Sequence, residues 1–82
     1  MSEEAISGYY FDTWMGRVYI LKEVDEAFHI YCGNHHLGTD TSPQFALNRI
    51  LEDHCLSPGE NVPPSLLGVP RQLSDWEVVP ME

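Results

Sequence analysis

The segment Thr41–Leu56, TSPQFALNRILEDHCL, decides the fold that this sequence predicts. Ser42 can accept a hydrogen bond from an early helical N–H. Pro43 suits the first helical position, because the N–H that it lacks would have no partner there. The sequence Ser57-Pro58-Gly59 is expected to end the helix, since proline disfavours helical dihedrals in the residue before it. We therefore predict one helix within this segment.

The predicted helix has one apolar side. Residues of an α-helix turn by about 100° each, so residues three and four apart share a side. The apolar side carries Ala46, Leu47, Ile50, Leu51, His54 and Cys55, and the polar side carries Asn48, Arg49, Glu52 and Asp53. Such a division is typical of a helix that packs against a sheet.

Three strands are predicted before the helix. Their sequences are rich in aromatic and β-branched residues, which favour strands. They are Gly8–Met15, Arg17–Val24 and Ala27–Gly33, with a turn at Met15-Gly16 and a tight hairpin at Asp25-Glu26. Gly33–Asp40 is predicted to be a loop or a short edge strand.

The ends of the chain carry weaker patterns. Residues 1–7 have few anchors and are expected to fray. The proline-rich Gly59–Gln72 is predicted to be irregular, attached to the core by Leu66, Leu67 and Val69. Leu73–Val79 is either a last short strand or a wrapped extension anchored by Trp76. The predicted architecture is therefore α+β: one domain over residues 1–82, with a three-stranded antiparallel sheet, one helix packed on it and an irregular C-terminal extension.

Alternation along the strands predicts two apolar sheet faces, because successive side chains of a strand point to opposite sides. The face under the helix is expected to contain Tyr9, Phe11, Val18, Ile20, Phe28, Ile30 and Cys32. The reverse face is expected to contain Tyr10, Trp14, Tyr19, Leu21, His29 and Tyr31. A face this apolar is rarely left bare, so either the C-terminal segment or another molecule covers it.

Charge narrows the range of partners. The 82 residues include 13 Asp and Glu but only 4 Lys and Arg, which gives a formal net charge of -9. An acidic surface repels phosphate groups, so we expect no direct binding to nucleic acid and none to an anionic membrane. Basic proteins are the expected partners. With two cysteines, no signal-peptide pattern and no membrane-spanning run, a cytoplasmic location is expected.

The histidines and cysteines are the side chains that could support metal binding or catalysis. Cys32-x-x-His35 has the spacing of zinc ligands, and His36, His54 and Cys55 could add to it. However, His54 and Cys55 would point about 100° apart on a helix, so both cannot easily face one ion. The alternative is that the cysteines are small core residues. The sequence contains no phosphate-binding glycine loop and no nucleophile motif, so we predict no cofactor, no metal site and no enzymatic activity.

Carboxylates are the side chains best suited to bind a partner. Held on a rigid fold, they can pair with Lys and Arg side chains that are arranged for phosphates. The alternative is an acidic surface that serves solubility alone. Phe45 lies on the polar side of the helix, where it either packs on the loop at the helix start or contacts a partner. The predicted partner-binding residues are Glu23, Asp25, Glu26, Asp40, Phe45, Glu52 and Asp53.

Two resemblances bear on function. The run Gly38–Ser65, with Gly38, Thr39, Thr41, Ala46, Leu47, Pro63, Pro64 and Ser65, resembles the helix and trailing Pro-Ser of HicB-type antitoxins, small acidic proteins that neutralise a basic ribonuclease toxin. It departs from them because Gly-Asn-His-His-Leu replaces the usual Pro-Asp-Leu-Pro-Gly-Cys segment and no DNA-binding segment follows. In size, acidity and expected fold, the chain is similar to phage-encoded inhibitors such as anti-CRISPR proteins, some of which imitate DNA.

These observations predict a phage-type inhibitor. It would bind a basic nucleic-acid-binding protein or complex of the host through acidic, DNA-like contacts, and a homodimer is compatible with it. An antitoxin that neutralises a basic ribonuclease and a zinc-stabilised structural module are the alternatives.

Overall fold

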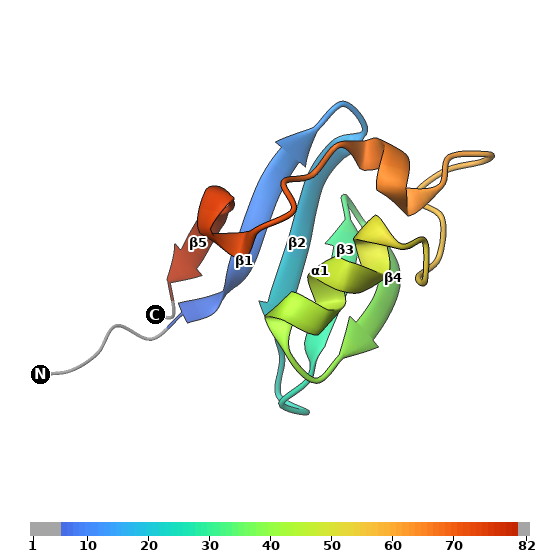
Figure 1. Ribbon diagram of the computed structural model, residues 1–82. Helices are drawn as coiled ribbons and strands as arrows, with labels where there is room; N and C mark the ends of the chain where they lie inside the picture. Colours follow the sequence, from blue (N-terminus) through green and yellow to red (C-terminus); the bar gives the residue numbers. More distant parts are fainter. Residues whose placement is uncertain (1–5, 81–82) are drawn as a thin grey trace, which may run out of the picture.

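The computed structural model describes residues 6–80, which form a five-stranded antiparallel sheet with one α-helix on one face (Figure 1). The first four strands follow one another as a meander. The fifth strand follows the helix and pairs with the first, so the sheet order is β4-β3-β2-β1-β5. The strands are β1 (Ile6–Thr13), β2 (Gly16–Lys22), β3 (Phe28–Cys32), β4 (His35–Asp40) and β5 (Glu77–Pro80).

The prediction of a three-stranded sheet is wrong, because the sheet has five strands. Of the two additional strands, β4 lies in Gly33–Asp40 and β5 begins in Leu73–Val79, two segments where a strand was only one of two predicted alternatives. β4 contains one buried apolar residue, Leu37, and a glycine, so its alternation is weak. β5 is four residues long and ends in proline. An edge strand is held largely by backbone hydrogen bonds to a single neighbouring strand. Almost any sequence can make such bonds, so an edge strand leaves little pattern in the sequence. A two-residue turn brings β4 beside β3, and Gly33 adopts a φ of 61° there, which glycine tolerates without strain.

The N-terminal end of the sheet also differs from the expected bounds. β1 begins at Ile6, so residues 6 and 7, which were expected to fray, lie in the strand, and Ser7 donates a hydrogen bond to the carbonyl of Val79 at 3.1 Å. The rest of the segment that was expected to fray, residues 1–5, lies outside the described residues.

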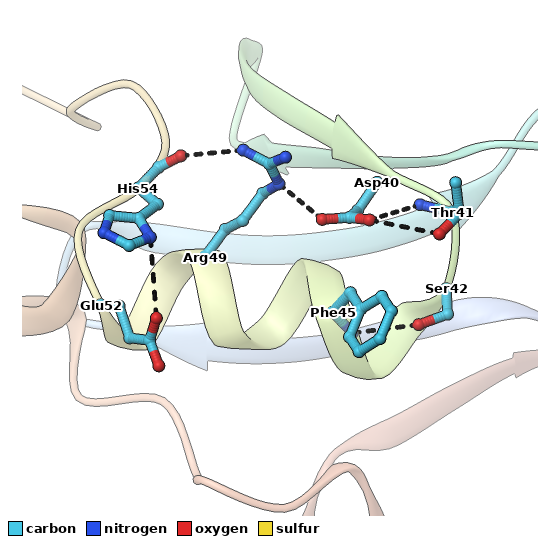
Figure 2. Close-up of polar contacts among 7 residues, drawn as sticks. All are labelled: Asp40, Thr41, Ser42, Phe45, Arg49, Glu52 and His54. Atoms are coloured by element: carbon cyan, nitrogen blue, oxygen red, sulfur yellow. Dashed lines mark hydrogen bonds and ion pairs between the residues drawn. The ribbon is translucent and has the colours of Figure 1, made fainter.

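Helix α1 (Pro43–Leu51) begins where the sequence predicts. The Ser42 Oγ accepts a hydrogen bond from the Phe45 N–H at 3.1 Å, with Pro43 in the first turn (Figure 2). The helix ends earlier than expected, because Asp53 adopts a φ of 60°. The Leu56 N–H then donates to the Leu37 carbonyl at 2.9 Å, so this part of the chain pairs with β4.

The core lies between α1 and the predicted inner face of the sheet. The expected strand residues Val18, Ile20, Ile30 and Cys32 are buried there, while Tyr9, Phe11 and Phe28 pack around them. The helix contributes Ala46, Leu47 and Ile50, each 0% exposed. Burying one such Leu or Ile side chain stabilises the fold by about 1.5–3 kcal/mol. The assignment of the inner face is therefore confirmed.

The C-terminal segment packs on the same face as α1 (Figure 1). It contains two short 3₁₀ helices, η1 (Pro64–Leu67) and η2 (Leu73–Asp75). Leu67, Val69 and Trp76 are buried in the shared core, and the Trp76 indole N–H donates to the Pro70 carbonyl at 3.1 Å. Leu66, which was expected to attach this segment, is instead 61% exposed. No described helix is long and apolar enough to cross a membrane.

Candidate protein-binding surface

The reverse face of the sheet carries a row of rings. The strand register aligns Tyr10 with Tyr19, Tyr19 with Tyr31, and Tyr31 with His36 across four neighbouring strands. Leu21 and His29 form the next row. Because α1 and the C-terminal segment both lie on the other side, these side chains stay partly exposed. We call this surface the open face, and it consists of Tyr10, Tyr19, Leu21, His29, Tyr31 and His36.

Trp14 does not belong to the open face, although alternation places it there. It lies in the turn between β1 and β2, where strand alternation no longer applies, and is 68% exposed. Its indole N–H donates to the Leu66 carbonyl at 3.0 Å, which links this turn to η1.

Three of the predicted partner-binding residues lie together in the turn between β2 and β3. We call residues 23–26, with Glu23, Asp25 and Glu26, the acidic turn. The Tyr31 hydroxyl donates to the Glu23 carboxylate at 2.6 Å. This contact raises the pKa of Tyr31 above its usual value, because ionised tyrosine would face a carboxylate. The acidic turn is therefore joined directly to the open face.

Asp25 is held by two donors. Its carboxylate accepts hydrogen bonds from the Ala27 N–H at 3.1 Å and from the His29 Nε2 at 3.0 Å. Both hydrogen bonds lower the pKa of Asp25, the one from Ala27 more than the one from His29, because each favours the ionised carboxylate. Glu26 is exposed and adopts a φ of 67°. This left-handed backbone conformation costs any residue other than glycine about 1–2 kcal/mol. The turn thus holds the Asp25 carboxylate in a fixed position and favours its ionised form.

A chain of hydrogen bonds crosses the open face from the acidic turn. The His29 Nδ1 lies 3.0 Å from the His36 Nε2, while the His29 Nε2 faces Asp25. Since an ionised carboxylate only accepts, the His29 Nε2 donates to Asp25. Asp25 therefore orients the His29 ring, and the other nitrogen of that ring contacts His36.

The other predicted partner-binding residues lie around α1, and Figure 2 shows Asp40, Phe45 and Glu52. Asp40 is occupied within the fold: its carboxylate lies 2.6 Å from the Arg49 Nε and accepts from the Thr41 N–H at 2.7 Å. Arg49 comes first among the causes that lower the pKa of Asp40. Arg49 also donates to the His54 carbonyl at 3.2 Å, so it links the end of β4 to the residues after α1.

Phe45, Glu52 and Asp53 take different positions around α1. Phe45, in the first turn, is 55% exposed. Glu52 follows the last turn and lies 3.6 Å from the His54 Nδ1. Asp53 accepts hydrogen bonds from the Ser65 N–H at 2.8 Å and Oγ at 3.0 Å, which attaches η1 to the residues that follow α1. The seven predicted residues therefore do not form one surface, because α1 lies on the covered side of the sheet.

The sequence reasoning missed two features of the site. Arg17 pairs with Asp12 through two contacts, at 2.6 and 3.2 Å, and its guanidinium lies 4.2 Å from the centre of the Tyr10 ring. His36 was not placed on the reverse face, because Gly33–Asp40 was predicted only as a loop or a short edge strand, whereas β4 aligns His36 with Tyr31. The Asp12–Arg17 pair could have been predicted, because these residues flank a predicted tight turn and therefore face each other across the hairpin.

The cysteines and the remaining histidines do not meet at one point. Among residues 6–80, no three His, Cys, Asp or Glu side chains are grouped as metal ligands, and the same part of the chain contains no pocket. Cys32 is buried in the core, whereas His35, His36 and His54 are exposed. Burial raises the pKa of the Cys32 thiol and raises that of Cys55 to about 11, so both thiols resist ionisation.

Comparisons of the chain with models of protein families, with curated proteins and with solved structures gave no match.

Proposed function

We propose that this protein is a stoichiometric inhibitor that binds a basic protein and blocks its nucleic-acid-binding surface. The observation that carries the proposal is the acidic turn at the border of the open face. Two of its carboxylates, those of Glu23 and Asp25, are fixed by contacts with Tyr31, Ala27 and His29. A protein–protein interface combines a desolvated aromatic centre with a charged rim. Here the open face supplies the aromatic centre, and the acidic turn supplies the charged rim.

The distribution of positive charge supports the same proposal. Arg17 and Arg49 are held in ion pairs with Asp12 and Asp40, so these two arginines do not neutralise the acidic turn. The formal net charge of -9 therefore acts on the surroundings as a strongly negative field. Such a field attracts a basic groove and accelerates association, most strongly at low salt.

Two settings are consistent with this activity. In the first, the protein is a phage-encoded inhibitor of a host nucleic-acid-targeting complex, similar in profile to anti-CRISPR proteins. In the second, it neutralises a basic ribonuclease toxin, as HicB-type antitoxins do. Both require the same physical act, and the identity of the captured partner distinguishes them.

The test is capture of a partner from bacterial lysate, followed by competition. The tagged protein is used at about 0.05 M and 0.5 M salt, because screening weakens contacts between exposed charges. We expect capture at low salt and release of the partner by added duplex DNA or RNA. Charge reversal at Glu23 and Glu26 should weaken capture, whereas reversal at the exposed Glu60 and Asp75, with the same change in net charge, should not. A partner that binds nucleic acid and this protein together would exclude the proposal.

A further inference from the structure

We infer that the open face receives an arginine-bearing segment of the partner, with guanidinium groups stacked on its tyrosine rings and paired with the carboxylates at its border. The inference rests on the proposed function and deepens it by naming the contact surface and the recognised side chain. It departs from the sequence-based prediction, which also placed partner contacts on the helix side of the sheet.

The fold already contains one example of this recognition. Arg17 lies over the Tyr10 ring at 4.2 Å and forms two contacts with the Asp12 carboxylate. A planar guanidinium that stacks on an aromatic ring while it pairs with a carboxylate satisfies both of its binding modes. Tyr31 presents a second ring joined to a second carboxylate, because its hydroxyl contacts Glu23 at 2.6 Å. No described Lys or Arg contacts the Tyr31 ring as Arg17 contacts Tyr10.

The charges on this side of the sheet favour a cationic occupant. Glu23 and Asp25 border the open face at the acidic turn, and Glu77 on β5 stands beside Tyr10 in the strand register. Lys22 faces the other side, because it pairs with Phe28, which packs on the core. On this side of the sheet, Arg17 is therefore the cationic side chain of β2, and its charge is already neutralised by Asp12.

Other occupants fit the surface less well. Aromatic sheet faces can stack nucleic-acid bases, but those surfaces add Lys and Arg for the phosphates, whereas this one is bordered by carboxylates. A second copy of this chain would bring two negative borders together, which is unfavourable. The four strands of the row span about 14 Å, enough for one helix or one extended segment of a partner.

The experiment uses hexa-arginine and hexa-lysine peptides as probes of the whole protein. Binding is followed by NMR of the tyrosine ring signals and by titration calorimetry. We expect hexa-arginine to shift the signals of Tyr19 and Tyr31 and to bind at least threefold more tightly than hexa-lysine, since lysine cannot stack or form a bidentate pair. Glu23→Gln should weaken hexa-arginine binding at least threefold, and the matched control Glu60→Gln should leave it unchanged. Near-ultraviolet circular dichroism verifies that both variants are folded.

Several results would overturn the inference. Equal affinity for the two peptides, an equal effect of Glu23→Gln and Glu60→Gln, or shifts confined to residues around α1 would each show general charge attraction instead. Binding of a single-stranded oligouridylate at the same rings would show a nucleic-acid surface, and shifts that depend on protein concentration without peptide would show a second copy. These outcomes are separate from the proposed function, which fails only if the captured partner still binds nucleic acid.

Discussion

Asp40→Asn should destabilise the fold without weakening partner binding. The Asp40 side chain is 17% exposed, and it contacts the Arg49 Nε at 2.6 Å and the Thr41 N–H at 2.7 Å. Asparagine has the same shape but loses the charge. A hydrogen bond to a charged group contributes about 1.5–3 kcal/mol, and the partial exposure of Arg49 reduces this, so we expect a loss of about 1–2 kcal/mol. For a domain of this size, the melting temperature then falls by roughly 4–16 °C.

The pH dependence of this stability loss shows whether the charge of Asp40 causes it. Arg49, and then the Thr41 N–H, lower the pKa of Asp40 below the ordinary carboxyl value of 3.8. A group with a lowered folded-state pKa stabilises the fold above its unfolded-state pKa, and this stability is lost as the pH falls through the folded-state value. The difference between wild type and Asp40→Asn should therefore be constant near neutral pH and shrink below about pH 4.

Urea denaturation followed by tryptophan fluorescence measures this difference. Trp76 is buried and reports on loss of the core. Asp75→Asn, at an exposed carboxylate in η2, is the matched control and should change the free energy of unfolding by less than about 0.5 kcal/mol. The reasoning is refuted if Asp40→Asn is as stable as wild type at pH 7, or if its deficit is the same at pH 2 as at pH 7.

Three further predictions concern the fold. Ser42→Ala should cost about 1 kcal/mol, measured by urea denaturation, because the Phe45 N–H loses its partner; a change below about 0.3 kcal/mol would exclude the cap. Ile50→Ala should cost about 2–5 kcal/mol, since this fully buried side chain leaves a cavity, and a thermal melt like that of wild type would contradict the described core. At pH 8, a thiol reagent should modify Cys55 far more slowly in the folded protein than in urea, because burial raises the pKa of this thiol to about 11; equal rates would show that the thiol is accessible.

The sequence predicts the parts of the fold that depend on local chemistry. Ser42 and Pro43 mark the helix start because a cap acts within one turn. Alternation assigns the inner face correctly, since Val18, Ile20 and Ile30 must all be removed from water. Contacts that join distant segments are not visible in this way. The pairing of β5 with β1 and the contact of Leu56 with Leu37 form only after the chain has folded back.

The candidate site was predictable in part for the same reason. The acidic turn follows from three carboxylates in four residues of one hairpin. The sequence does not show that Tyr31 reaches Glu23, nor that Asp40 and Asp53 bind within the fold, because these contacts depend on side-chain direction and on partners up to 12 positions away. His36 joined the site only when β4 was placed beside β3.

The most direct test of the central claim asks whether the captured partner can hold nucleic acid and this protein at the same time. The partner is loaded with labelled duplex DNA or RNA, titrated with this protein, and followed by fluorescence anisotropy and analytical ultracentrifugation. We predict that the nucleic acid is released as one equivalent of the protein binds, and that Glu23→Lys with Glu26→Lys weakens the release. A stable complex of all three components would contradict the claim.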